Sequence, residues 1–173
     1  PRYSALVDER FGGNWSPGLR SPSDWHTVNF FFHNHLGLTQ TPMVADNEDT
    51  KGTAFTVTVD YRHGTTTGIS AEDRTATVRN LANPNAGAAD FVRPGHVFPL
   101  IAREGGVLMR SGHTEAAVAL CKLAGLPPVG VIGELVNDDG SVMRGPQVSA
   151  FAAQNGFKEV SVADLIAYRQ RKE

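Results

Sequence analysis

Alternation of apolar and polar residues predicts one clear β-strand near the middle of the chain. In Thr53–Asp60 (TAFTVTVD) the two kinds of side chain alternate with a period of two, and β-branched residues are frequent. This pattern is typical of a half-buried strand. Further strands are expected at Gly95–Ala102, at Val129–Val136, where an apolar run has the length of a strand, and at Glu159–Ser161, a short one.

The segments between these strands carry helix signals. Ser70 can cap a helix over Ala71–Leu81, Asp73 stands where a capping box has its acidic partner, and Pro84 ends the helix. Three more helices are predicted, over Thr114–Ala124, Pro146–Asn155 and Val162–Arg169. Strands interleaved with helices predict an α/β or α+β fold, a single domain with a mixed sheet and packed helices.

The first 30 residues differ from the rest of the chain. Gly and Pro interrupt them and no apolar period is sustained, so we expect a divergent, loop-rich N-terminal segment over residues 1–30 with one short strand at Tyr3–Val7. The domain proper is expected over residues 31–173. Two histidines, His33 and His35, could share one face of a strand and bind a metal, although exposed histidines are the commoner finding.

Composition narrows the function classes. A chain of 173 residues with 40% hydrophobic and 20% charged residues is typical of a soluble globular domain. The net charge of −2 argues against broad nucleic-acid binding, and no apolar run has the length of a membrane span. The single cysteine, Cys121, excludes an internal disulfide and a Cys-based zinc site. A cytoplasmic protein that binds neither nucleic acid nor membranes is expected.

Candidate chemistry is concentrated between residues 93 and 134. The stretch Arg110–Glu115 (RSGHTE) follows Arg93–His96 (RPGH) and precedes Glu134. Glycines let backbone N–H groups approach an anion, arginine supplies a fixed positive fork, and histidine with glutamate can move protons. A helix that begins after Gly112 adds unpaired N–H groups that favour phosphate. The set predicts a site for a small phosphorylated or carboxylated substrate, with scattered surface polar residues as the alternative.

Each candidate residue also has a structural interpretation. His96 could be a histidine at the edge of the core that is bonded to the backbone, and Arg110 an exposed turn residue. Glu134 follows apolar residues, where an unpaired carboxylate would be costly, so a functional role is favoured for it. Glu115, in the first turn of its predicted helix, is expected to complement the helix dipole.

An ordered series of motifs makes the chain resemble a known family. The series, over about Leu36–Arg169, is Gly52–Thr56 (GTAFT), Thr67–Ser70 (TGIS), Arg93–Pro99 (RPGHVFP), Gly105–Leu108 (GGVL), Gly112–Ala116 (GHTEA), Gly130–Ile132 (GVI) with Glu134, Asn137–Gly140 (NDDG) and Val162–Tyr168 (VADLIAY). Together they resemble the 3,4-dihydroxy-2-butanone 4-phosphate synthase family of riboflavin biosynthesis. The resemblance implies that family's fold.

The resemblance also implies an activity. Members of the family are lyases that convert D-ribulose 5-phosphate to 3,4-dihydroxy-2-butanone 4-phosphate and formate, with Mg²⁺, or Mn²⁺ in its place, and no organic cofactor. They are homodimers with active sites at the interface. Carried over, His96 and Glu134 would be catalytic and His113 a metal ligand. Substrate would be bound by Arg110, Ser111, Gly112, His113, Thr114 and Glu134. A divalent cation can stabilise the enediolate that forms when a proton is removed beside a ketone.

One part of the family pattern is missing. The family has an acidic N-terminal loop similar to DDEDRENEGD that supplies a metal-binding glutamate, whereas this chain has Asp8-Glu9-Arg10 followed by Phe11. Glu9 could substitute as the ligand, or could be an ordinary solvated charge. Two alternatives stay open for this reason: an enzyme of the family that acts on another small hydroxy-ketone or sugar phosphate with altered metal use, or a non-catalytic paralogue.

Overall fold

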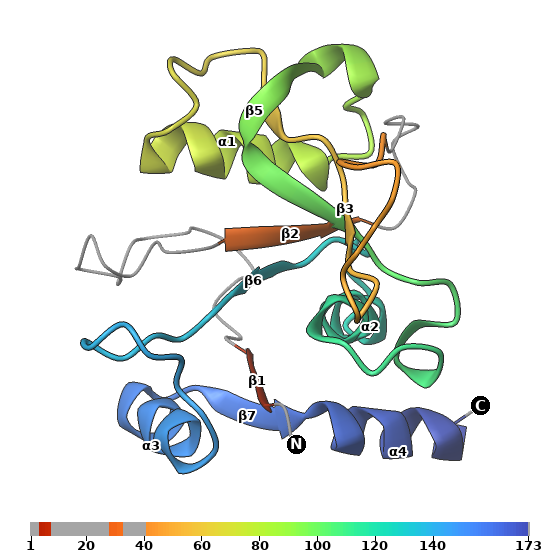
Figure 1. Cartoon of the computed structure of the whole chain (residues 1–173), viewed down its shortest axis with the longest axis vertical. Helices are drawn as coiled ribbons and strands as arrows, with labels where there is room; N and C mark the ends of the chain where they lie inside the picture. The colour runs from red at the N-terminus through yellow and green to blue at the C-terminus, as the bar shows by residue number, and fades with distance from the viewer. Residues whose placement is uncertain (1–3, 8–27, 33–40, 173) are drawn as a thin grey trace.

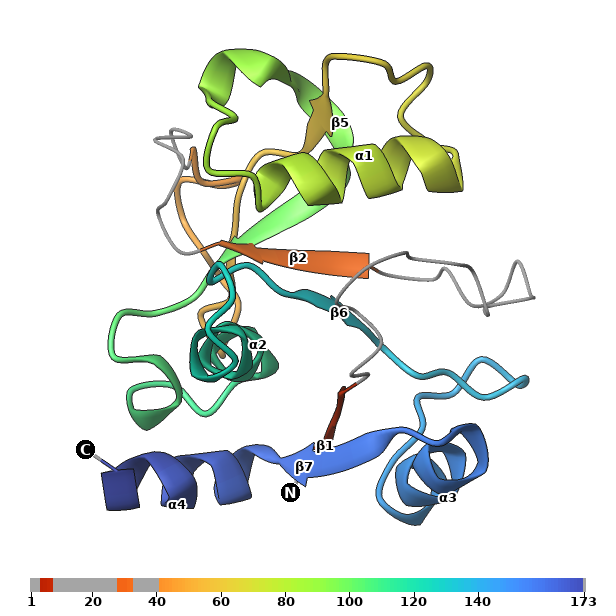
Figure 2. The ribbon, with the colours of Figure 1, turned by 180° about the vertical axis from the view of Figure 1, so that it is seen from behind.

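The computed structural model describes residues 4–7, 28–32 and 41–172. In this part of the chain the elements are stacked in layers (Figure 1), with helix α1 (Ala71–Leu81) on one face of a mixed sheet and helix α2 (His113–Leu123) on the other. A further layer contains α3 (Pro146–Asn155) and α4 (Val162–Lys172), as the view from behind also shows (Figure 2). The predicted α+β fold with a mixed sheet and packed helices is confirmed.

The mixed sheet is organised around one long strand, β5 (Phe91–Ile101). Its order is β3-β5-β2-β6, and β4 also pairs with β5. Strand β2 runs parallel to β5, whereas the other pairs are antiparallel. The shorter strands are β2 (Val28–Phe32), β3 (Ala54–Phe55), β4 (Val59–Tyr61) and β6 (Val131–Gly133).

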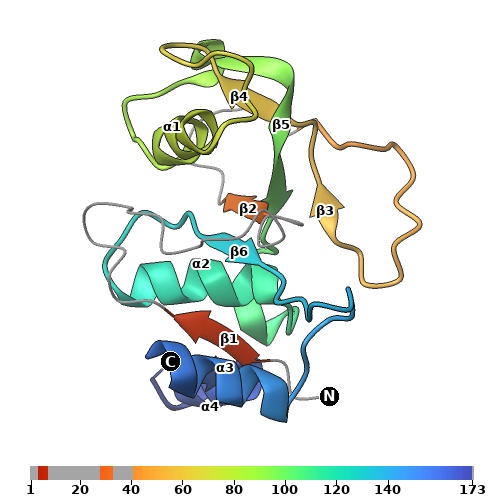
Figure 3. The same cartoon turned by 90° about the vertical axis from the view of Figure 1, so that its left-hand side faces the viewer.

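A second, two-stranded sheet pairs the two ends of the described chain. Strand β1 (Ser4–Val7) is antiparallel to β7 (Lys158–Ser161), with Ser4 opposite Ser161. Figure 3 shows β1 beside α3 and α4, away from α1. The short strand expected at Tyr3–Val7 is therefore present over the four described residues.

The prediction of a single strand over Thr53–Asp60 is wrong, because this segment forms parts of two short strands, β3 and β4, that each pair with β5. The pairing register shifts between Val59 and Asp60, and Thr56 forms an isolated bridge with Pro42. The strand expected over Val129–Val136 is shorter than predicted. After Gly133 the chain turns back on itself, and the N–H of Met143 donates to the carbonyl of Leu135 at 2.8 Å.

The predicted helices are present, with small differences at their ends. Ser70 caps α1, and its Oγ accepts from the N–H of Asp73 at 3.1 Å. Helix α3 has Pro146 in its first turn and Gly156 at its C-cap with φ 71°, a left-handed conformation that glycine adopts without strain. Helix α4 extends three residues past Arg169, and its basic last turn complements the helix dipole.

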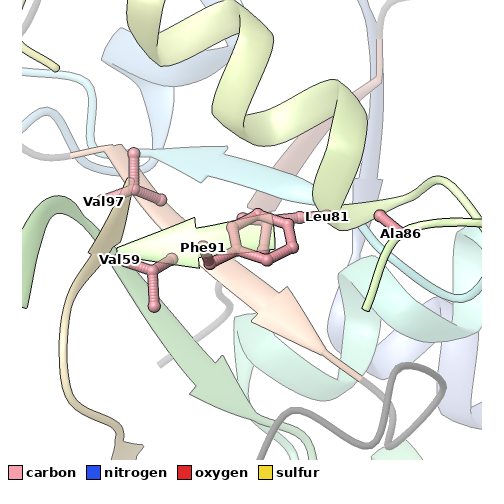
Figure 4. Close-up of a cluster of buried hydrophobic side chains, with 5 residues drawn as sticks. All are labelled: Val59, Leu81, Ala86, Phe91 and Val97. Atoms are coloured by element: carbon pink, nitrogen blue, oxygen red, sulfur yellow. The ribbon is translucent and has the colours of Figure 1, made fainter. Parts of the chain in front are cut away.

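The core consists of three clusters that join the layers. The first lies between α1 and the β4–β5 pair and contains Val59, Leu81, Ala86, Phe91 and Val97 (Figure 4). The second joins α2 to α4 through Val107, Ala116, Ala119, Val162 and Leu165, and the third packs Val118 of α2 against Leu100 of β5 and Ala102, which follows β5. Burial of one Val, Leu or Phe side chain contributes about 1.5–3 kcal/mol. Both faces of β5 are thus fixed, which holds the residues on it in place.

Among the described residues no helix is both long enough and apolar enough to cross a bilayer. The residues Glu9, His33 and His35 lie outside the described part of the chain.

Candidate active site

Arg110 lies at the centre of the site, just before α2. Its Nη1 donates to Glu115 Oε2 at 2.7 Å and to Thr114 Oγ1 at 3.3 Å. Its Nε donates to the carbonyl of Lys51 at 3.1 Å, and its Nη2 to Thr53 Oγ1 at 3.0 Å. One guanidinium group thus joins the start of α2 to the loop before β3. Arg110 is not the exposed turn residue of the alternative interpretation.

Glu115 is buried, and it makes contacts beyond any interaction with the dipole of its own helix. Its side chain is 0% exposed, and Oε1 accepts from the backbone N–H of Arg103 at 2.9 Å. Its other oxygen binds Arg110, so both charges of the pair are compensated, as burial of an ion pair requires. The helix-dipole role that the sequence suggested is therefore incomplete.

The N-terminus of α2 has no side-chain cap. The N-cap residue is Gly112, and its N–H donates to the carbonyl of Arg110 at 2.8 Å. Unpaired N–H groups and the positive end of the helix dipole make such a terminus favourable for an anion. Ser111 beside it is exposed, whereas Thr114 is buried. This geometry suits the phosphate end of a small substrate.

His113 is the first residue of α2 and is partly buried, and its Nε2 atom is inaccessible to solvent. Burial lowers the pKa of its imidazole below the usual 6.5, and the positive charges of Lys51 and Arg110 lower it further, while Glu134 acts in the opposite direction. His113 therefore favours the neutral form, with Glu134 within electrostatic range. Glu134 itself is exposed, so the cost expected for an unpaired carboxylate beside the apolar run does not arise.

His96 lies in a second group of residues, on β5 and β4. Its Nδ1 is 2.7 Å from Asp60 Oδ2, and its backbone N–H donates to Asp60 Oδ1 at 2.9 Å. Because an ionised carboxylate only accepts, Nδ1 carries the proton, and the lone pair of the neutral ring is on Nε2. The His96 side chain is 41% exposed, so the ring can reach a ligand. Asp60 thus holds both the backbone and the ring of His96. The alternative interpretation expected His96 to be held in place, but by the backbone.

The backbone of Gly68 closes over the His96–Asp60 pair. A Cβ atom on Gly68 would lie 2.1 Å from Asp60 Oδ2 and 2.7 Å from His96 Nδ1, and the residue has φ 83°. Only glycine fits both the space and the backbone conformation. The N–H of Gly68 donates to Asp73 Oδ2 at 2.9 Å, which anchors this loop on α1.

The residues present meet part of what a divalent metal ion requires. A metal ligand must be deprotonated, and the lowered pKa of His113 keeps its imidazole neutral near pH 7. Magnesium prefers oxygen ligands. The Glu134 carboxylate is a source of such ligands within electrostatic range of His113, whose pKa it raises. Within the described ranges no group of three or more His, Cys, Asp or Glu side chains could hold a metal. His113 thus fits as one ligand of a larger set.

The structure therefore brings the sequence candidates together in two groups. Arg110, His113, Thr114 and Glu134 lie around the start of α2, and His96 lies on the sheet. Sequence reasoning missed Asp60 and Thr53, and it missed the contacts that Glu115 makes with Arg103 and Arg110. The one available signal for Asp60 was its place at the polar end of the predicted strand, next to a polar loop.

Comparison with known proteins gives consistent relatives. The family model of 3,4-dihydroxy-2-butanone 4-phosphate synthase matches residues 32–168. The riboflavin biosynthesis protein RibBA of Salinispora arenicola is 58% identical over 132 residues, which is 76% of this chain and 31% of that protein. The chloroplastic bifunctional riboflavin biosynthesis protein RIBA 1 of Arabidopsis thaliana is 59% identical over 128 residues, 74% of this chain and 24% of that protein. The chain spans less than a third of the length of these relatives.

Solved structures agree with the sequence relatives. A 3,4-dihydroxy-2-butanone 4-phosphate synthase in complex with two magnesium ions is 45% identical, with a TM-score of 0.78 over 83% of this chain and 72% of that chain. RibBX, a two-domain synthase from A. baumannii, is 38% identical with a TM-score of 0.78, over 84% of this chain and 44% of that chain. From the matched residues and the shared fold, this chain belongs to the 3,4-dihydroxy-2-butanone 4-phosphate synthase family.

Proposed function

We propose that this chain is a lyase of riboflavin biosynthesis that converts D-ribulose 5-phosphate to 3,4-dihydroxy-2-butanone 4-phosphate and formate. The observation that carries the proposal is the uncapped start of α2, with neutral His113 and the Glu134 carboxylate beside it, in a chain of this family. The two products together contain every atom of the substrate. The reaction therefore needs no oxidant or reductant, and the proposal includes no organic cofactor.

The phosphate end of the substrate is proposed to bind at the start of α2. The N–H groups of the first turn and the positive charge of Arg110 attract an anion there, and Ser111 and Thr114 supply hydroxyl groups. The proposed substrate-binding residues are Arg110, Ser111, Gly112, His113, Thr114 and Glu134.

His96 and Glu134 are proposed to move the protons. Asp60 fixes the ring of His96 so that Nε2 is the atom that accepts a proton, and the resulting imidazolium would be stabilised by the same carboxylate. Glu134 is exposed and can exchange protons with a bound ligand. Two such groups suit a reaction in which protons are removed and returned several times.

A divalent cation, Mg²⁺ or Mn²⁺, is the proposed cofactor, with His113 as one ligand. One structural relative is a complex with two magnesium ions. When bound, such a cation would stabilise negative charge that develops on substrate oxygens. The remaining ligands would be oxygen atoms, as magnesium prefers.

A homodimer with active sites at the interface is the proposed assembly, formed by the domain over residues 31–173. Its support is the separation of the site residues into two groups on different elements, since an interface lets two copies contribute to one site. Exposed apolar side chains, among them Phe55 on β3 and Phe98 on β5, supply surface for such a contact. A cytoplasmic location stays a prediction from composition, and the Arabidopsis relative is named chloroplastic.

Formate release tests the proposal directly. The chain is incubated with ribulose 5-phosphate and Mg²⁺, and formate is measured with a coupled dehydrogenase. Formate is expected, and its production should stop when a chelator removes the metal. No formate at high enzyme concentration with added Mg²⁺ would overturn the proposed activity.

Variants test the proposed roles. Glu134→Gln and His96→Ala should each abolish turnover while the melting temperature stays near that of the parent. His113→Ala should weaken both substrate and Mg²⁺ binding in calorimetry. Cys121→Ser is the control and should keep full activity, because this partly buried thiol contacts the carbonyl of Val129 at 3.4 Å and belongs to neither group of site residues.

A further inference from the structure

The buried carboxylate of Glu115 is a charged group of the site that the proposed proton transfers and substrate contacts do not use. An acidic residue at the third position of a helix often accepts a hydrogen bond from the N-cap N–H. In α2 that N–H, from Gly112, donates instead to the carbonyl of Arg110. The two oxygens of Glu115 accept from Arg103 and Arg110 instead, so Glu115 does not act as the acidic partner of a capping box.

The contacts of Glu115 join the end of β5 to the start of α2 and, through Arg110, reach a loop that is distant in sequence. Oε1 receives the N–H of Arg103, which follows β5, and Oε2 receives Nη1 of Arg110, which precedes α2. Through Arg110 the network continues to Lys51 and Thr53 in the loop before β3. The pair is well shielded from water, with Arg110 17% exposed and Glu115 0% exposed.

These hydrogen bonds hold Arg110 in a single orientation. A guanidinium group has five N–H donors, and four of those of Arg110 are directed at protein acceptors. The side chain is thus fixed before a ligand arrives. It can offer a ligand its charge and one further N–H, at a defined place.

Gly112 supports this interpretation by its close approach to the pair. A Cβ atom on Gly112 would lie 2.4 Å from Arg110 Nη1 and 2.6 Å from Glu115 Oε2. The N-cap residue and the ion pair therefore occupy the space that an alanine side chain would need.

We propose that Glu115 is a positioning residue for substrate binding. It holds Arg110, and through Arg110 the Lys51–Thr53 loop, against the first turn of α2, so that the phosphate end of the substrate meets a preformed set of donors. A preformed site saves the free energy of ordering these groups when the substrate binds. This inference rests on the proposed function for its substrate.

The first test compares Glu115→Gln with the control Glu104→Gln, which alters an exposed carboxylate nearby. Glu115→Gln keeps the size and one acceptor but removes the charge that holds Arg110. It should raise KM for ribulose 5-phosphate about tenfold or more while kcat changes little, the signature of lost binding that is equal in ground and transition states. The Kd for ribulose 5-phosphate, measured by calorimetry, should rise by the same factor.

A second variant leaves both charges in place. Gly112→Ala should displace the ion pair and raise KM and Kd in the same direction, whereas Gly87→Ala, where an added Cβ meets no atom within 4 Å, should change neither. Melting temperatures are recorded for all four variants, because a merely structural role would lower stability and the active fraction, and hence kcat, without a change in KM or Kd.

The outcomes separate the two proposals. Unchanged KM and Kd in folded Glu115→Gln or folded Gly112→Ala would overturn the positioning role, and so would unfolding of both variants, because Glu115 would then be structural. If the parent chain yields no formate, the proposed activity fails. The Kd for ribulose 5-phosphate still tests Glu115 in that case, and a parent chain that does not bind this sugar phosphate would overturn the positioning role as well.

Discussion

At the scale of single residues, the site depends on carboxylates that act on neighbouring side chains. Asp60 orients His96, and Glu115 holds Arg110. A second histidine–carboxylate pair, His63 with Asp90 at 2.9 Å, lies on the surface, with His63 57% exposed. The His63–Asp90 pair can therefore serve as a control for the His96–Asp60 pair at the site.

Asp60→Asn should lower kcat about 10- to 100-fold and leave KM nearly unchanged. An amide at this position can donate to Nδ1, so the proton of the neutral ring would move to Nε2, the atom that should accept one. Steady-state formate assays over a range of pH measure the effect. Asp90→Asn is the matched control, and an equal loss of kcat in both variants would remove Asp60 from the mechanism.

Asp73 should make stability depend on pH in the acid range. Hydrogen bonds from the Thr66 hydroxyl and from the N–H groups of Thr66 and Gly68 hold the pKa of Asp73 below its usual 3.8, against the effect of burial. The unfolded chain therefore takes up this proton first as the pH falls. The stability that Asp73 contributes is complete above about pH 4 and is lost as the pH falls through the folded-state pKa.

Melting temperatures between pH 3 and pH 6 test this expectation. The parent chain should lose stability toward the acid end more steeply than Asp73→Asn. Glu72→Gln is the control, because Glu72 is exposed in the same turn of α1. If the Asp73→Asn curve is parallel to that of the parent, the acid sensitivity has another source.

At the scale of elements, one hydroxyl group adds a hydrogen bond to the apolar contact between α1 and β4. Thr77 is fully buried, its Oγ1 donates to the carbonyl of Asp73 at 3.0 Å, and it accepts from the N–H of Tyr61 at 2.9 Å. The bond to Tyr61 fixes β4 against α1, and therefore also Asp60 on β4.

Thr77→Val should lower the free energy of unfolding by about 1–3 kcal/mol, because the N–H of Tyr61 loses its acceptor in the interior. Chemical denaturation measures the change. Thr75→Val, a partly buried threonine on the same helix, should cost less. Equal losses in the two variants would show that the bond to Tyr61 is not the cause.

The extent to which these elements follow from sequence differs from one to the next. Helix α1 was predicted to the residue because Ser70 and Asp73 are local signals that act on the backbone beside them. The split of the Thr53–Asp60 segment was not, because it depends on pairing with Pro42 and on the register with β5. The site shows the same difference between local and tertiary signals. Sequence motifs indicate His96, Arg110 and His113. The roles of Asp60, Thr53 and Glu115 depend on contacts that only the tertiary fold creates.

At the scale of the whole molecule, the exposed apolar surface is the main clue to assembly. Phe55 lies opposite Leu100 in the register, and Phe98, two residues from Leu100, belongs to the same face of the sheet. Such neighbours on one face lie within reach of each other. Both aromatic side chains are exposed, Phe55 by 37% and Phe98 by 41%, and a protein contact could cover them.

Sedimentation equilibrium should give a mass of about twice 18.6 kDa if the proposed dimer forms. Phe98→Asp should shift the chain toward the monomer and reduce formate production in parallel, because the sites are proposed to lie at the interface. Val44→Asp, at an exposed apolar residue in the loop before β3, is the control. A parent chain that is monomeric at all concentrations would contradict the proposed assembly.

The position of β2 has a consequence for how the chain folds during synthesis. This strand comes from residues 28–32, yet it lies between β5 and β6, so its two edges pair with segments that end at residues 101 and 133. The ribosome delivers β2 early and its partners much later. The edge of β2 that pairs with β5 can close once Ile101 has left the exit tunnel, but the edge that pairs with β6 stays unpaired until Gly133 has left it. A pause in translation before that point would lengthen the time in which β2 can pair with another chain.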